Sequence, residues 1–200
     1  MTLHGHGSPH HDWHSTEYVD DWIERDVTRD EQRRLHLRRM LGFAALPPDA
    51  KIDVLDIGAG YGIVTQEVLL AFPNAHVTLH DFSEPMLDHA RRRLAANADR
   101  TTYVFSDLSR PDWTNALGKR FDLAVSAIAI HNLASEGRIP QIYSEVASVL
   151  KPGAAFLNYE IVSFTGGVEG HLEWLRRAGF LEVTCPWQDE HNAILVARIG

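Results

Sequence analysis

The sequence predicts one α/β domain built on a mostly parallel β-sheet. Segments with the apolar, β-branched composition of strands alternate with helical segments about five times along the chain. The strand segments are apolar nearly throughout, as in sheets that helices cover on both faces. The length of 200 residues, with 44% hydrophobic and 23% charged residues, is ordinary for a single soluble globular domain.

The first fourteen residues are expected to form a flexible arm, because they hold five histidines, two glycines and a proline. Imidazole groups suit zinc, copper and nickel. These histidines have no regular spacing and no cysteine nearby, so we expect no physiological metal site. The only cysteine of the chain, Cys185, also excludes an intramolecular disulfide framework and a cysteine-built metal centre.

Residues 15–50 are expected to form two helices. Tyr18 and Trp22 stand with other apolar residues on one face of the first helix. The second is expected to begin at Thr28, because Thr28–Glu31 has the pattern of a capping box, and to run to about Leu41.

Strand and helix signals alternate from residue 51 onward, separated by glycine, proline and asparagine. The last two strands are joined by about six residues, which favours antiparallel pairing. Strands are expected at 52–57, 75–81, 102–105, 121–130, 154–162, 180–185 and 192–199, and helices after Gly62 to about 72 and at 84–97, 139–150 and 170–178.

Glycine or polar residues follow several of the predicted strands. In a doubly wound sheet, ligands bind at the carboxyl ends of the strands, near the point where the strand order reverses. We therefore expect a binding site built from residues 56–62, Asp81, Asp107, His131 and Glu160.

The glycine-rich turn at 56–62 is suited to close approach of a ligand to the backbone. A dinucleotide fingerprint would need glycine where Ile63 stands, and a phosphate-binding P-loop would need a lysine that is absent. A nicotinamide-dependent oxidoreductase is therefore a less favoured alternative. Asp81 could accept both hydroxyls of an unphosphorylated ribose, and Asp107 could accept the amino group of a purine.

Five sequence blocks together resemble the class I S-adenosylmethionine-dependent methyltransferases. The resemblance spans residues 50–199 and implies a Rossmann-like, doubly wound, seven-stranded sheet with the last strand antiparallel and an N-terminal helical lid. It divides the chain into an arm at 1–14, a lid at 15–50 and an S-adenosylmethionine-binding domain at 51–200. The blocks are 54–62, 80–87, 121–126 with 131–133, 149–154 and 178–180.

The resemblance also implies a role for individual residues. Glycine-loop residues line the methionine part of the cofactor, strand-end carboxylates bind its polar groups, and apolar side chains flank its adenine. The implied residues are Gly58, Ala59 and Gly60 for methionine, Asp56 for the same region through water or the ammonium group, Asp81 for ribose, Phe82 and Leu108 for the adenine faces, Asp107 for the adenine amino group, backbone of Ser126 or Ala127 for the ammonium group, and Tyr18 and Trp22 in the lid.

His131 and Glu160 are the candidate catalytic residues, because an acceptor that loses a proton during methyl transfer needs a base. His131 could instead shape the acceptor pocket, and Glu160 could form an ion pair. The small lid and the short connection at 163–180 leave little room for a segment that reads a macromolecule. We therefore expect a small-molecule acceptor and release of S-adenosylhomocysteine (SAH).

The charge balance of 19 basic against 27 acidic residues disfavours tight nucleic-acid binding. The arginine clusters, including Arg33 and Arg34, are therefore expected to form solvated helix faces. No apolar run is long enough for a membrane span, and no secretion signal is recognised, so we expect cytoplasmic residence. A same-fold protein that binds the cofactor without methyl transfer and a macromolecule methyltransferase remain alternatives, and the oligomeric state is open.

Overall fold

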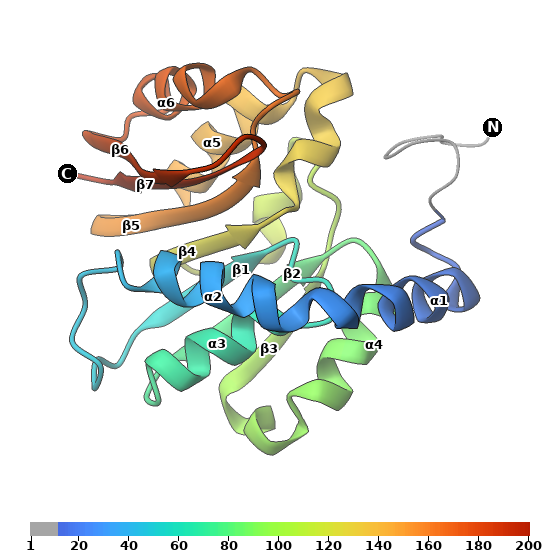
Figure 1. Cartoon of the computed structure of the whole chain (residues 1–200). Helices are drawn as coiled ribbons and strands as arrows, with labels where there is room; N and C mark the ends of the chain where they lie inside the picture. The colour runs from blue at the N-terminus through green and yellow to red at the C-terminus, as the bar shows by residue number, and fades with distance from the viewer. Residues whose placement is uncertain (1–11) are drawn as a thin grey trace.

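Seven strands form one sheet in the order β3-β2-β1-β4-β5-β7-β6 (Figure 1). The computed structural model describes residues 12–200. Strands β1 to β5 run parallel, and β7 is antiparallel to both β5 and β6, which confirms the predicted Rossmann-like sheet. The strands are β1 Asp53–Ile57, β2 His76–Asp81, β3 Thr101–Phe105, β4 Phe121–Ala127, β5 Leu150–Ile161, β6 Glu182–Gln188 and β7 Asn192–Arg198.

The strand order reverses between β1 and β4. From β1 the chain adds β2 and β3 on one side, and then returns to add β4 and β5 on the other. Ile57 at the end of β1 pairs with His80 of β2 and Ser126 of β4. The loops that leave β1 and β4 therefore diverge, and a crevice forms between them at the carboxyl edge of the sheet.

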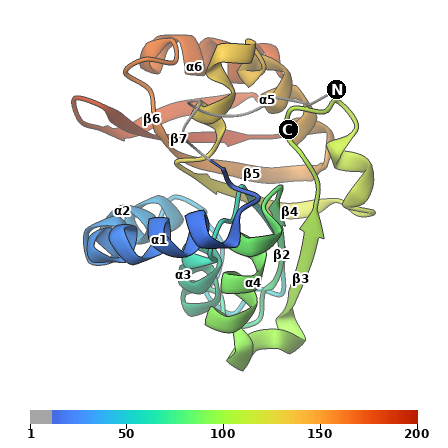
Figure 2. The same ribbon diagram turned by 90° about the vertical axis from the view of Figure 1, so that its right-hand side faces the viewer.

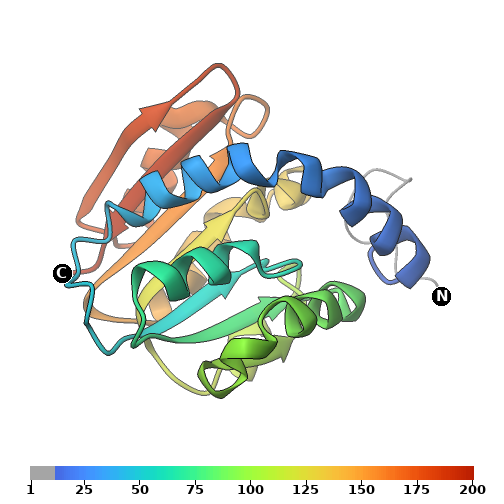
Figure 3. The same cartoon turned by 60° about the horizontal axis from the view of Figure 1, so that its bottom comes forward.

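The helices cover the sheet on both faces. Buried side chains of α2, α3 and α4 pack in one cluster, and those of α5 and α6 in a second cluster on the other face. Figure 2 and Figure 3 show α2, α3 and α4 together on their side of the sheet. The helices are α1 Thr16–Asp26, α2 Asp30–Leu41, α3 Ile63–Ala71, α4 Glu84–Arg93, α5 Ile139–Ser148 and α6 Gly167–Arg177.

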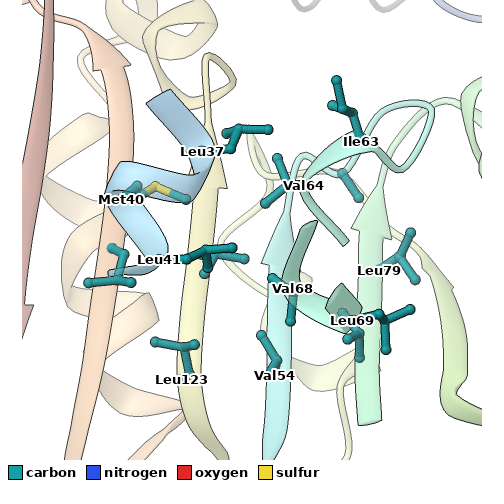
Figure 4. Close-up of a cluster of buried hydrophobic side chains, with 14 of the residues drawn as sticks. Leu37, Met40, Leu41, Val54, Ile63, Val64, Val68, Leu69, Leu79 and Leu123 are labelled. Carbon is teal, nitrogen blue, oxygen red and sulfur yellow. The ribbon is translucent and has the colours of Figure 1, made fainter. Parts of the chain in front are cut away.

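The first apolar cluster fixes α2 against the sheet (Figure 4). Leu37 and Met40 of α2 are fully buried, as are Val54 of β1, Val68 of α3 and Leu123 of β4. Burying apolar side chains of this size contributes about 1.5–3 kcal/mol each relative to exposure. Helix α2 is therefore part of the folded core and not a loosely attached appendage.

A buried carboxylate adds a polar attachment between α2 and α3. Glu67 of α3 is 2% exposed. It accepts a hydrogen bond from Arg38 Nε at 2.7 Å and another from Arg34. The prediction that Arg33 and Arg34 lie on a solvated face is wrong, because both guanidinium groups are partly buried in ion pairs with acidic side chains.

Strand β4 is shorter than the sequence pattern predicts. It ends at Ala127 instead of Ile130, because Ile128 adopts a left-handed backbone conformation with φ +51° and a 3₁₀ helix follows at Ile130–Glu136. The apolar residues that extend the strand pattern thus belong to a turn and a short helix at the carboxyl edge of the sheet.

Several helix boundaries also differ from prediction; helix α6, for example, begins at Gly167 and not at Gly170. The expected helix at 84–97 ends at Arg93, and a 3₁₀ segment with a kink at Asn97 follows. The second helix begins at Asp30 and not at Thr28, because the Thr28 hydroxyl donates to the Arg25 carbonyl within a 3₁₀ turn and caps no helix.

Four of the five arm histidines lie outside the described residues. The structure therefore does not test the expectation that they form no metal site. Among residues 12–200, no three histidine, cysteine, aspartate or glutamate side chains are grouped as metal ligands. Within the same residues, no helix has both the length and the apolar character that crossing a bilayer requires.

Leu37→Ala is expected to lower the free energy of unfolding by about 2–5 kcal/mol, because it removes a fully buried side chain. Leu35→Ala on the same helix is the matched control. Leu35 is 65% exposed, so its loss is expected to change stability by no more than about 0.5 kcal/mol. Chemical denaturation of both variants measures the difference, and equal effects would contradict the packing of α2 described above.

Candidate functional site

A cavity of about 330 Å³ lies at the carboxyl edge of the sheet, in the crevice between the β1 and β4 loops. Ten of the residues predicted for the site line it, and four do not. The lining set contains Gly58, Ala59, Gly60, Asp81, Phe82, Asp107, Leu108, Ala127, His131 and Trp22, whereas Asp56, Ser126, Glu160 and Tyr18 are outside it.

The glycine-rich loop forms the floor of the cavity after β1. Gly58 has φ +66°, and a Cβ atom on it would lie 2.4 Å from the Cβ atom of Ala129. Only glycine therefore allows the β1 loop to approach the loop that follows β4. The Ala59 N–H donates to the His80 carbonyl at 2.9 Å, which fixes the loop against the end of β2.

Asp81 ends β2 and faces the cavity. Its Oδ2 accepts from the Gly60 N–H at 2.8 Å, and its Oδ1 accepts from the Ser83 N–H at 2.9 Å. Burial raises the pKa of Asp81, while these backbone donors oppose the rise. The carboxylate thus joins the ends of β1 and β2, and each of its oxygens has lone pairs available to a ligand hydroxyl.

The loops after β2 and β3 bring Phe82, Asp107 and Leu108 to the same end of the cavity. The Asp107 carboxylate accepts from the Ser109 N–H at 2.9 Å, so the loop that it begins is held in a turn. Two apolar side chains beside a carboxylate can hold a flat ring that carries an amino group. This is the arrangement that the sequence predicts for adenine.

Asp56 and Ser126 lie in the protein interior beneath the cavity. The Thr65 hydroxyl donates to Asp56 Oδ2 at 2.6 Å, and Asp56 Oδ1 has no hydrogen-bond partner within residues 12–200. Burial raises the pKa of Asp56 to about 7. The Ser126 hydroxyl donates to the Ile57 carbonyl at 2.9 Å, so this side chain connects β4 to β1.

His131 and Glu160 form a hydrogen-bonded pair at the ends of β4 and β5. His131 Nδ1 lies 2.7 Å from Glu160 Oε1, and the Glu160 side chain is fully buried. Glu160 Oε2 also accepts from the N–H groups of Ile130 and His131 at 2.9 and 3.2 Å. Because a carboxylate only accepts, the pair places the proton on Nδ1 and leaves the Nε2 lone pair of His131 available.

The N-terminal segment contributes aromatic side chains to the site, among them Trp22, which the resemblance implies for the lid. Trp13 and Trp22 line the cavity, and their ring centroids are 5.3 Å apart in an edge-to-face arrangement. Tyr18 packs on Trp13 from outside the cavity, with 5.4 Å between the ring centroids. Trp13 lies next to the predicted first helix, but nothing in its local sequence indicates the contact with Trp22.

Tyr61 and Arg33 connect α2 to the glycine-rich loop. The Tyr61 hydroxyl donates to Asp30 at 2.6 Å and accepts from Arg33 at 2.5 Å. Arg33 also pairs with Asp26 at 2.6 Å, and Arg93 lies 4.7 Å above the Tyr61 ring. Tyr61 is part of the glycine motif, which could have indicated its position, whereas the position of Arg33 depends on how α2 packs.

A family model described as a methyltransferase domain matches residues 54–153 of the chain. A demethylmenaquinone methyltransferase of Chlamydia pneumoniae is 29% identical over 135 residues, which cover 68% of this chain and 54% of the relative. A ubiquinone/menaquinone biosynthesis C-methyltransferase of Paracoccus denitrificans is 30% identical over 155 residues, 76% of this chain and 58% of the relative. A release factor glutamine methyltransferase of Chlorobaculum tepidum is 33% identical over 111 residues, 54% of this chain and 38% of the relative.

Solved structures share the fold. An O-methyltransferase family protein from Burkholderia thailandensis aligns with a TM-score of 0.76 at 17% identity, over 93% of this chain and 60% of that protein. The structure described as PigF with SAH aligns with a TM-score of 0.69 at 16% identity, also over 93% and 60%. The chain spans about half the length of the curated relatives it matches. The family model matches half of the chain and the fold agrees with it, so this chain belongs to the class I S-adenosylmethionine-dependent methyltransferases.

Proposed function

We propose that the chain transfers a methyl group from S-adenosylmethionine to a small-molecule acceptor and releases SAH. The observation that carries the proposal is the position of His131, held by buried Glu160, on the wall of the cavity that also contains the glycine-rich loop and Asp81. A candidate base and a candidate cofactor site therefore open into the same space.

The residues present suit the family's methyl donor. We assign the ribose hydroxyls to Asp81, the adenine amino group to Asp107, and the adenine faces to Phe82 and Leu108. The backbone of the 58–60 loop and Ala127 faces the methionine part, and the unpartnered oxygen of Asp56 lies below it. When bound, the donor supplies an electrophilic methyl group on a positively charged sulfur.

The chain's own contribution to methyl transfer is alignment, exclusion of water and proton transfer. Trp13 and Trp22 cover the cavity from the helical side, and we propose residues 15–50 as a lid over a cofactor-binding domain at 51–200. His131 takes a proton from the acceptor at Nε2, and Glu160 holds the ring and stabilises the imidazolium that forms.

A small acceptor is supported by the size of the cavity and by relatives whose names refer to quinone biosynthesis. The net negative charge favours an acceptor other than nucleic acid. We further propose cytoplasmic residence, which the single cysteine of the chain suits. The direct test is incubation with S-adenosylmethionine and a panel of small acceptors, with SAH and the methylated product detected by mass spectrometry.

Asp81→Asn is expected to weaken SAH binding at least tenfold, or about 1.4 kcal/mol, because the amide removes the charge and one acceptor oxygen from the ribose site. Calorimetric titration measures the loss. Asp88→Asn is the matched control, since Asp88 is an exposed residue of α4 that pairs with Arg91. Unchanged affinity in folded Asp81→Asn would contradict the assignment of the ribose.

SAH affinity is expected to rise between pH 6 and pH 8. Because burial raises the pKa of Asp56 to about 7, its carboxyl is mostly protonated at pH 6 and mostly ionised at pH 8. An ammonium group prefers the ionised form, so affinity increases by about three- to tenfold across this range. Calorimetry at both pH values tests this. The affinity of Asp56→Asn should be independent of pH, and an equal dependence in that variant would remove Asp56 as the cause.

Glu160→Gln is expected to lower kcat by about 100-fold or more and to leave SAH affinity unchanged. In the wild-type protein, both carboxylate oxygens of Glu160 accept hydrogen bonds from Ile130 and His131. The amide of the variant has only one acceptor oxygen, so it no longer fixes the His131 tautomer. Glu67→Gln is the matched control, because Glu67 is equally buried and ion-paired but does not touch His131. If both variants lost kcat in parallel with stability, the role of Glu160 would be structural only.

A further inference from the structure

An exposed aromatic side chain lies beside the candidate base. Phe164, in the connection between β5 and α6, is 64% exposed. Its ring centroid is 5.9 Å from that of His131, and the two rings are nearly perpendicular at 86°. Phe164 is outside the set of residues that line the cavity, and its ring contacts His131, which is one of them.

The backbone around Phe164 is firmly held. The N–H groups of Val162 and Ser163 donate to the His191 carbonyl at 2.9 and 3.2 Å. The Gly167 N–H closes the turn by donating to the Val162 carbonyl at 2.9 Å. Phe164 is therefore exposed on an ordered turn, and its exposure does not result from a lack of local contacts.

A buried polar chain fixes the same turn from below. The Thr165 hydroxyl donates to the Ile161 carbonyl at 2.9 Å, and it therefore accepts from His171 Nε2 at 2.8 Å. Tyr143 in turn donates to His171 Nδ1 at 2.5 Å. Burial lowers the pKa of His171, which keeps the ring in the neutral form that this chain of hydrogen bonds requires. The turn that carries Phe164 is thus attached to α5 and α6.

The chemistry of the base restricts the acceptor. An imidazole removes protons efficiently from groups whose pKa is not far above its own. A phenolic hydroxyl, with a pKa of about 10 as in tyrosine, meets this condition, whereas an aliphatic alcohol is much less acidic. The cavity wall also carries Trp13, Trp22 and Ile128, which are aromatic or aliphatic, beside the polar side chains of Arg33 and Asn132.

We propose that the acceptor is an aromatic hydroxyl compound of the phenol class, and that Phe164 determines this specificity by packing against its ring. This inference rests on the proposed function. The phenolic proton passes to His131 Nε2 and an oxygen lone pair forms the new bond to the methyl carbon. The bond from that carbon to sulfur breaks, and its electron pair stays on the sulfur of the released SAH.

The test compares para-cresol with its saturated counterpart para-methylcyclohexanol, which has a similar shape but no aromatic ring or acidic hydroxyl. Binding of each to the SAH-saturated protein is followed by NMR titration, and methylation by mass spectrometry with S-adenosylmethionine. We expect para-cresol to bind more tightly and to be the one methylated. Phe164→Ala should weaken its binding about fivefold to tenfold with kcat nearly unchanged, and Phe164→Tyr should restore it.

Leu181→Ala is the control for loss of an exposed apolar side chain, since Leu181 is 75% exposed and makes no contact with the site. Equal binding of the two compounds, or wild-type binding of para-cresol by Phe164→Ala, would overturn the inference. So would methylation of the saturated alcohol in preference to para-cresol. SAH binding and methylation of the wider acceptor panel are measured separately. The proposed function fails if the wild-type protein binds no SAH or methylates no small acceptor, whereas the present inference alone fails if it binds SAH and methylates acceptors other than phenols.

Discussion

Burying carboxylates at the carboxyl edge of the sheet is the constraint on which the site depends. An ionised carboxylate is costly to bury unless donors surround it. Glu160 accepts from three backbone N–H groups and from His131, and Asp81 accepts from two backbone N–H groups. The loops after β1, β2 and β4 supply all of these backbone donors except the N–H of Ile161, which belongs to β5. Their shapes are therefore fixed by the same hydrogen bonds that make the carboxylates tolerable. Asp56 has the Thr65 hydroxyl as a side-chain donor, and burial raises its pKa to about 7.

The helical layer is coupled to this edge through Tyr61. Its hydroxyl contacts Asp30 and Arg33 of α2, and its position in the glycine-rich loop puts it at the cavity wall. Glu67 of α3, the helix that follows this loop, accepts hydrogen bonds from the guanidinium groups of Arg34 and Arg38. Removing one partner of a buried ion pair destabilises the fold, because the remaining charge is left buried without compensation. Helix α2 therefore holds a fixed position over the loop. The segment before it is attached as well, because the Ser83 hydroxyl donates to the Trp13 carbonyl and His89 contacts Asp20 of α1.

The sequence patterns predict the parts of this structure that depend on local signals. The alternation of strand and helix segments predicts the parallel sheet. The position of Asp81 at the end of a strand predicts that it lies in the cavity, because the carboxyl ends of parallel strands share one edge of the sheet. The patterns failed where distant segments decide the outcome. Ile128 has the apolar character of a strand residue, yet it turns away from the strand. Arg33 reads as a surface residue, and only the packing of α2 on α3 makes it part of the site. Phe164 lies in the connection after β5, and no motif in the sequence indicates that its ring meets His131.

The turn at Ile128 shows how the site offsets a local cost. A β-branched residue with φ +51° is a genuine outlier, and such conformations cost about 1–3 kcal/mol. The Ile128 N–H keeps its ladder bond to the Tyr159 carbonyl at 2.8 Å, so the strain begins only after the last paired position. Two residues later the Ile130 N–H reaches Glu160, followed by that of His131. A continued strand would carry these two donors past Glu160 and leave its carboxylate poorly satisfied in the interior. The strained turn is stable because it completes the hydrogen bonding of a buried charge, and the orientation of His131 follows from that requirement.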